Sequence, residues 1–275
     1  MIMAFDVLWS IGAVFAWGPA SLAAAGLMYI VGEWIGWPQA AVAAPLAYLL
    51  FLLVLVVTVG GLGRLLPKPV AGTSRVFVDG QFFLFLLHWG LERYVPRPFI
   101  SHIQLLTSLR TLYFRLMGAE LGWSTHLRPG AQVWGPALVR LGHLTYIGDF
   151  AHLTSHLSQG DKLLLAPVVM GDRCNVGAHA NVAPGCTFGH DVRVGALTDI
   201  APGCWVEDDV EIGPRCVLGM QVKLGAGSRL LPRTFLDSWT TVPPGEIWGG
   251  DPGSKVGDVR QTAGAARRKK RRQGG

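Results

Sequence analysis

One apolar residue recurs at every sixth position between residues 170 and 242, and no other feature constrains the fold as strongly. The run consists of Met170, Val176, Val182, Phe188, Val194, Ile200, Val206, Ile212, Leu218, Leu224, Leu230, Leu236 and Val242. A period of six matches neither the turn of an α-helix nor the alternation of a simple strand. Short strands joined by tight turns, with three hexads in each coil, do match it. The sequence therefore predicts a parallel β-helix whose coils stack about 4.8 Å apart and stabilise one another.

Small residues hold a second fixed position, two residues before the apolar one, and glycine often follows the apolar residue. All four cysteines fall in this small-residue position: Cys174, Cys186, Cys204 and Cys216. Packing alone explains them. Their spacing contains no C-x-x-C pair of the kind that binds zinc. We expect neither a metal site nor, in a cytoplasmic setting, a disulfide.

The repeat and its flanks resemble the hexapeptide-repeat acyltransferases over residues 116–256. Residues 116–122 are similar to the family's lead-in to the first coil, and residues 242–256 to its closing Val-Pro-Pro-Gly segment. The resemblance implies a left-handed β-helix prism, although crossovers between parallel strands are normally right-handed. It also implies a homotrimer that takes an acyl group from a CoA thioester, with acetyl-CoA as the co-substrate and no metal.

The hexad pattern extends towards the N-terminus but breaks twice. Its earlier members are Leu121, Leu127 and Val133 in one register, then Leu141, Ile147 and Leu153 in another. Two changes of register indicate two insertions, the second over residues 154–169. Loops that leave a rigid scaffold are common places for functional residues, so we expect the active site at this second insertion.

The segment 146–156 resembles the catalytic stretch of the galactoside and maltose acetyltransferases, with an Ile-Gly-Asp hexad and then a strand that ends in Thr-x-His. This resemblance makes His156 the candidate general base, because an imidazole can take a proton from an attacking hydroxyl or amine near neutral pH. The alternative is that His156 is an ordinary polar loop residue with no catalytic role. Asp149 is the second candidate, either as a residue that orients His156 or the acceptor, or as a turn residue.

Three other histidines are weaker candidates. We expect His152, next to an inward-facing leucine, to point outwards, and His179 and His190 to lie in surface turns. His179 remains a reserve base. The fold also serves zinc-dependent carbonic anhydrases, but the resemblance requires a second histidine where this chain has Pro184.

The same resemblance implies where the donor binds. The CoA arm is expected along the prism at small residues of successive turns, Gly195, Ala196 and Gly213. Lys255 or Arg260 is expected to meet its phosphates, because a cation can pair with phosphate oxygens.

The N-terminal third carries most of the apolar excess of a chain that is 50% hydrophobic and only 15% charged. Residues 7–32 and 40–63 contain no charged side chain, and each run exceeds the ~20 residues that cross a bilayer. The turn between them, residues 33–39, contains two tryptophans. Residues 1–70 therefore predict a transmembrane helical hairpin. A secretory signal peptide is the alternative for the first run, but its start would be basic.

Three further regions complete the predicted organisation. Residues 71–117 are amphipathic and aromatic-rich, so we expect interfacial helices broken near Pro96 and Pro98, or helices packed on the prism. Residues 118–256 form the β-helix domain. The tail, residues 257–275, contains six consecutive basic residues and is expected to contact lipid or remain solvated.

Basic residues after the second apolar run and in the tail place the β-helix and both termini in the cytoplasm by the positive-inside rule. The formal charge of +6 comes largely from the tail, and nothing in the chain resembles a nucleic-acid-binding motif. The leading hypothesis is a membrane-anchored acyltransferase acting on a sugar, lipid-linked or amine acceptor. The alternatives are an amide-forming module that uses a carrier-protein thioester from a larger synthetase, and a non-catalytic trimeric membrane scaffold.

Overall fold

The computed structural model describes residues 2–93, 97–122 and 124–259, which form two compact units. The helical unit contains residues up to 70 together with 75–119 and 135–137, and the β-helix unit contains residues 71–74, 120–134 and those from 138 onwards.

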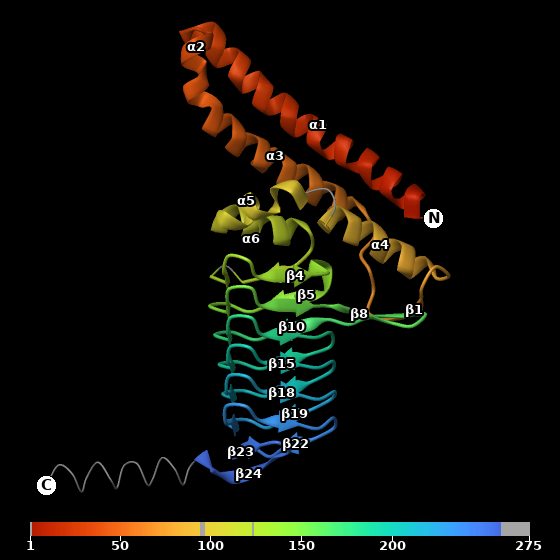
Figure 1. Cartoon of the computed structure of the whole chain (residues 1–275), viewed down its shortest axis with the longest axis vertical. Helices are drawn as coiled ribbons and strands as arrows, with labels where there is room; N and C mark the ends of the chain where they lie inside the picture. Colours follow the sequence, from red (N-terminus) through yellow and green to blue (C-terminus); the bar gives the residue numbers. More distant parts are fainter. Residues whose placement is uncertain (1, 94–96, 123, 260–275) are drawn as a thin grey trace, which may run out of the picture. The chain divides into compact units, whose positions relative to one another are not determined.

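Two long apolar helices open the helical unit (Figure 1). They are Ile2–Ile35 (α1) and Ala44–Leu65 (α3), joined by Trp37–Ala40 (α2) and the 3-10 helix Ala41–Ala43 (η1). Gly36, with a φ of +87°, separates α1 from α2, so the turn is shorter than the sequence predicted. Ser10–Ile35 and Trp37–Leu65 are long and apolar enough to cross a membrane. Some core helices and signal sequences also meet these two criteria.

Shorter helices complete the helical unit. They are Gly80–Arg93 (α4), the 3-10 helix Arg97–Phe99 (η2), Ile100–Leu105 (α5) and Thr107–Leu116 (α6). Helix α6 packs against α3, and the Tyr113 hydroxyl donates a hydrogen bond to the Glu92 carbonyl oxygen at 2.8 Å. Pro98 lies in η2, near the predicted break, whereas Pro96 lies outside the described residues.

The β-helix has three faces, and each regular coil contributes one strand to each face, while β24 closes the second face antiparallel to β23 (Figure 1). The first face contains, in order, Glu120–Leu121 (β2), Val139–Leu141 (β5), Val168–Met170 (β10), Thr187–Phe188 (β13), Trp205–Val206 (β16), Lys223–Leu224 (β19) and Thr241–Val242 (β22). The second contains His126–Leu127 (β3), Tyr146–Ile147 (β6), Asn175–Val176 (β11), Arg193–Val194 (β14), Glu211–Ile212 (β17), Arg229–Leu230 (β20), Glu246–Gly250 (β23) and Gly253–Asp258 (β24). The third contains Gln132–Trp134 (β4), His152–Thr154 (β7), Asn181–Val182 (β12), Asp199–Ile200 (β15), Val217–Leu218 (β18) and Phe235–Leu236 (β21).

The strands of successive coils pair in parallel and in the register that the hexads predict. Met170, for example, pairs with Leu141 on one side and Phe188 on the other. The hexad residues from Leu127 to Val242 point inwards and are at most 4% exposed. The predicted parallel β-helix is therefore confirmed, with a core made of the hexad residues.

Both predicted breaks of the repeat are present. The first is the 3-10 helix Pro136–Leu138 (η3), between β4 and β5. The second is a β-hairpin rather than a loop, formed by His156–Gln159 (β8) and Lys162–Leu165 (β9). A strand that the sequence did not predict, Gly72–Arg75 (β1), pairs with β9 to give a three-stranded sheet in the order β1-β9-β8.

Candidate active site

The hairpin of β8 and β9 leaves the corner between the third and first faces, where β7 ends. Its two strands are antiparallel, with His156 opposite Leu165 at the open end. Gly160 has a φ of +62°, as the first residue of a two-residue type II′ turn requires. Leu163 and Leu165 are buried, which anchors β9. His156 therefore lies at the base of the hairpin, next to the prism.

The indole of Trp134 holds this histidine. The imidazole of His156 stacks on the Trp134 ring with 6.1 Å between centroids and 16° between planes. The His152 ring contacts the same indole at 5.8 Å. The backbone N–H and the hydroxyl of Ser155 both donate to the Trp134 carbonyl oxygen at 3.0 Å. Trp134 thus fixes both the backbone before His156 and the plane of its ring.

Sequence reasoning did not single out Trp134. It ends β4 and pairs in register with Thr154 of β7, so it reaches His156 only because a neighbouring coil brings it there. Its position just before the first break in the repeat was the available signal. His152 is partly exposed on the outer side of β7, as predicted.

Asp149 and His179 lie at the corner between the second and third faces, whereas the hairpin leaves the corner between the third and first faces. The Asp149 carboxylate accepts a hydrogen bond from the Arg128 guanidinium at 3.3 Å. His179 is exposed and stacks on Phe150, with ring centroids 5.3 Å apart. The structure gives Asp149 an ion-pair partner on the previous coil, and its predicted role in orienting His156 stays a prediction.

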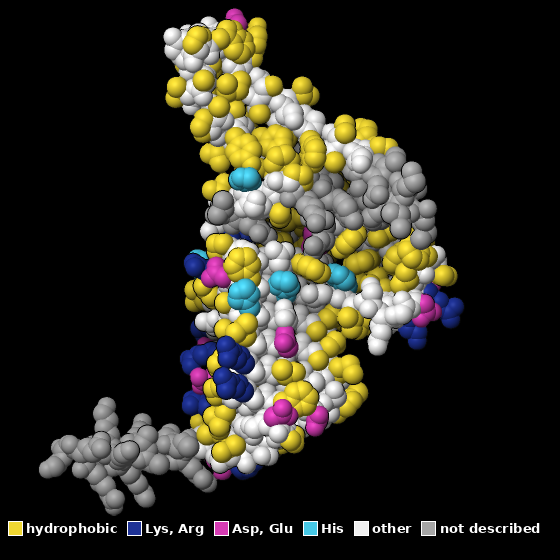
Figure 2. Space-filling view, in the orientation of Figure 1, with side chains coloured by type: hydrophobic (Ala, Val, Ile, Leu, Met, Phe, Trp, Pro, Cys, Tyr) yellow, Lys and Arg dark blue, Asp and Glu magenta, His cyan; other side chains and the backbone are white. Residues whose placement is uncertain are grey.

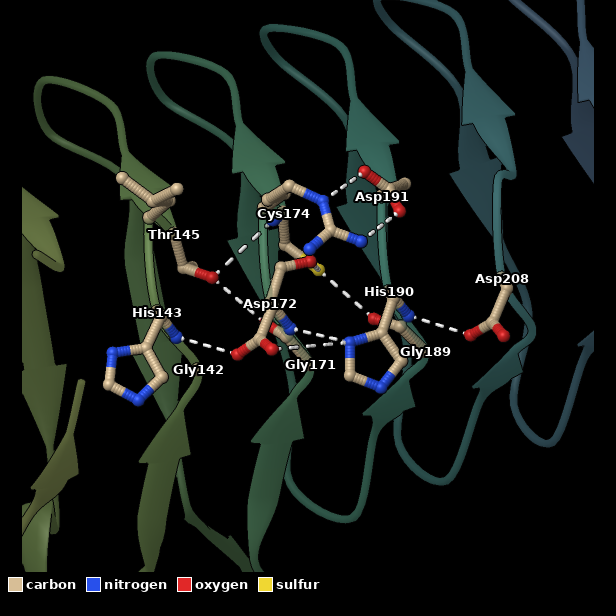
Figure 3. A network of polar contacts seen from close by, with 12 residues as sticks. Gly142, His143, Thr145, Gly171, Asp172, Cys174, Gly189, His190, Asp191 and Asp208 are labelled. Carbon is tan, nitrogen blue, oxygen red and sulfur yellow. Dashed lines mark hydrogen bonds and ion pairs between the residues drawn. The ribbon is translucent and has the colours of Figure 1, made fainter.

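Polar side chains at the corners bind successive coils to one another (Figure 3). At the corner between the first and second faces, Asp172 accepts from the His143 N–H at 2.7 Å, and Asp208 accepts from the His190 N–H at 2.7 Å. The Asp172 N–H donates to Nδ1 of His190 at 3.0 Å. His190 is therefore a corner residue with a structural contact, in keeping with its prediction.

Neighbouring charges at this corner are paired as well. Arg173 donates two hydrogen bonds to Asp191, at 2.7 and 2.6 Å. These bonds raise the pKa of Arg173 and lower the pKa of Asp191. Both side chains are well exposed, so the pair contributes little to stability.

The predicted donor residues lie away from His156 within one chain. Gly195, Ala196 and Gly213 occupy the corner between the second and third faces, at the opposite end of the third-face strands from the hairpin. A Cβ on Gly213 would lie 2.7 Å from the backbone nitrogen of Pro232, so stacking alone requires this glycine. Lys255 donates to Glu246 at 2.7 Å and pairs with Asp258 at 3.0 Å. The bond to Glu246 raises the pKa of Lys255. Arg260 lies outside the described residues.

A groove that the sequence analysis missed crosses β16, β19 and β22 on the first face. Its volume is about 390 Å³, and its lining includes Gly203, Trp205, Gln221 and Lys223. Trp205 is 53% exposed. Gly203 lies at the corner from which the hairpin leaves, two coils further along, a separation of about 10 Å. An exposed aromatic ring beside an amine suits a ligand with a flat ring and an anionic group.

On the face that Figure 2 draws, histidines and basic side chains form separate groups. Figure 2 shows histidines grouped on the early coils and lysines and arginines on the coils that follow. Arg215 and Arg233 are exposed at the corner of Gly195 and Gly213.

The cysteines behave as packing residues. All four are buried free thiols, and burial raises the pKa of Cys174 and of Cys216. Within the described part of the chain, no group of three or more His, Cys, Asp or Glu side chains is arranged to hold a metal ion.

Comparison with known proteins gives the class. No protein-family model matches the chain. The chain is 25% identical over 151 residues to WcaF of Escherichia coli (strain K12), which is named as a colanic acid biosynthesis acetyltransferase. The match covers 46% of this chain and 78% of WcaF, and WcaF of Shigella flexneri gives the same values.

Similar solved structures include a variant of the N-acyltransferase AntD from Bacillus cereus with dTDP and coenzyme A. It is 13% identical, with a TM-score of 0.43 and coverage of 58% of this chain and 95% of AntD. The UDP-N-acetylglucosamine acyltransferase LpxA of Bacteroides fragilis 9343 is 15% identical, with a TM-score of 0.38 and coverage of 55% and 74%. The assignment does not depend on these two structures.

The hexads, the β-helix that they build and the sequence similarity to WcaF agree with one another. In repeat, fold and sequence the chain resembles the hexapeptide-repeat acyltransferases.

Proposed function

We propose that the chain is a membrane-anchored acetyltransferase in which His156 takes the proton from a hydroxyl or amine as this acceptor attacks the thioester of acetyl-CoA. The observation that carries the proposal is the imidazole held flat against Trp134, at the base of the hairpin that interrupts a regular scaffold. The name of WcaF supports acetyl as the transferred group.

The transfer is direct and needs no acyl-enzyme. The acceptor oxygen or nitrogen forms a bond to the acetyl carbon, and the bond from that carbon to the CoA sulfur breaks. The acceptor proton moves to His156 and then to the sulfur, which leaves as a thiol. An imidazole can accept and release a proton near neutral pH, so one residue serves both steps. The acceptor class is a sugar, lipid-linked or amine compound.

Two surfaces compete as the donor site. One is the corner of Gly195, Ala196 and Gly213, where Arg215 and Arg233 would meet the phosphates; it requires a partner protomer, because His156 lies at the other end of the third face. The other is the groove lined by Trp205 and Lys223, which begins at the corner that carries the hairpin. We propose a homotrimer with the first arrangement, and the groove is the single-chain alternative.

The test of the base is His156→Ala. Turnover, measured as free thiol released from acetyl-CoA with a panel of sugar and amine acceptors, should fall by about 10²–10⁴-fold, with an unchanged melting temperature. His179→Ala is the matched control, since His179 contacts Phe150 at another corner; it should stay within about tenfold of the parent. Activity of His156→Ala within that same range contradicts the assignment and promotes His179.

Membrane anchoring is proposed from the two apolar helices, with the β-helix and both termini in the cytoplasm. Its test uses single cysteines, which is practical because the native thiols are buried. A membrane-impermeant maleimide should label Gln39→Cys only from outside and Gln273→Cys only from inside. Labelling of the tail from outside would overturn this topology.

A further inference from the structure

The hairpin that carries His156 is held by a segment far away in the sequence. Strand β1, residues 72–75, lies between α3 and α4 in the chain, yet it pairs with β9 of the hairpin. In Figure 1, β1 and β8 project together from the side of the stack. The regular hexads do not require this sheet, because their coils close without it.

A two-stranded hairpin is only marginally stable in water, and pairing with a third strand that has buried side chains increases its stability. Leu163 is fully buried, Leu165 is 2% exposed, and Ser74 of β1 is 7% exposed. Gly72, Thr73 and Arg75 are exposed, so Ser74 is the one side chain of β1 that faces the sheet's buried side. Strand β9 is central and β8, with His156, is at the edge.

We propose that β1 is a positioning strand for the active site: by pairing with β9 it fixes the hairpin and thereby the distance and plane of the His156 ring relative to Trp134 and the acceptor. The proposal rests on the proposed role of His156. A displacement of about 1 Å at a reacting group can lower the rate by about 10²-fold. Ser74 and its neighbours touch no reacting atom, so they act only through His156.

The test is a proline scan of β1 in the full-length protein in mild detergent. Successive N–H groups of a strand point to opposite sides, so only one of Thr73→Pro and Ser74→Pro removes a hydrogen bond to β9. Hydrogen exchange of backbone amides in residues 156–165 should quicken at least about tenfold in that variant and much less in the other. Exchange in residues 170–242 should not change. Ser74→Ala, which keeps the N–H, should retain the protection of the hairpin.

Activity provides the second readout. The proline variant that loosens the hairpin should lose about tenfold or more in kcat, with little change in the KM for acetyl-CoA. In a His156→Ala background the same proline should cause no further loss, because both changes act on one group. Unchanged exchange in both proline variants, or an equal further loss in the His156→Ala background, overturns the proposal. Full activity of His156→Ala alone would refute the proposed base and not the pairing of β1 with the hairpin. The two outcomes can be distinguished because the hydrogen-exchange result does not depend on the role of His156.

Discussion

The regular coils, residues 170–242, and the interrupted coils, residues 120–169, use the same repeat in different ways. In the regular coils the polar corner residues hydrogen-bond to the neighbouring coils, as His190 does with Asp172 on the coil before it and with Asp208 on the coil after it. In the interrupted coils, the Trp134 ring contacts the rings of both His152 and His156. The candidate site therefore lies where the regular stacking is interrupted, although pairs such as Arg128 and Asp149 join neighbouring coils there as well.

The largest predicted difference concerns stability. Gly213→Ala places a Cβ 2.7 Å from the Pro232 backbone nitrogen, and the two coils must separate to admit it. We expect a loss of about 1–3 kcal/mol in the free energy of unfolding, measured by thermal melting followed by circular dichroism. Gly257→Ala, where a Cβ would meet nothing within 4 Å, should change stability by less than about 0.5 kcal/mol. If both substitutions lowered the free energy of unfolding equally, close stacking of the coils would not explain why residue 213 is a glycine.

The second prediction separates positioning from binding. Trp134→Ala removes the surface on which His156 stacks and should lower kcat by roughly tenfold, about 1.4 kcal/mol, through misplacement of the base. Trp205→Ala, in the groove of the regular coils, should instead raise the KM for acetyl-CoA if the groove binds the donor. Steady-state kinetics with acetyl-CoA as the varied substrate distinguish the two. A raised KM with normal kcat in Trp134→Ala would assign Trp134 to substrate binding.

The smallest predicted effect decides between the two donor surfaces. Lys223→Glu reverses one charge in the groove and should raise the KM for acetyl-CoA roughly threefold to fivefold if phosphates bind there. Ala196→Trp should block the other corner and leave the groove unchanged. If that corner is the donor site of a partner protomer, mixing Ala196→Trp chains with His156→Ala chains should restore part of the activity. A fully active monomer in mild detergent would exclude the shared site.

The sequence contained enough information for the scaffold because its signal is local and periodic. Every hexad places an apolar residue at the same inward-facing position and leaves other positions facing outwards. The series that begins with Met170 and Val176 therefore predicted both the register of the strands and the residues of the core. The breaks were also visible, as shifts from Val133 to Leu141 and from Leu153 to Met170. The resemblance, rather than the periodicity, suggested the role of His156, which remains a prediction.

The sequence by itself determined the coils, the small-residue positions and the places where the repeat fails. Only the tertiary structure decided what forms at the breaks in the repeat. There it has a hairpin instead of a loop, strand β1 paired with that hairpin, and Trp134 stacked against His156. It also paired Asp149 with Arg128 and shaped the groove beside Trp205. The physical reason is that periodic stacking repeats one short-range pattern in every coil, whereas each of these contacts occurs once, between segments whose separation in the chain bears no relation to the period.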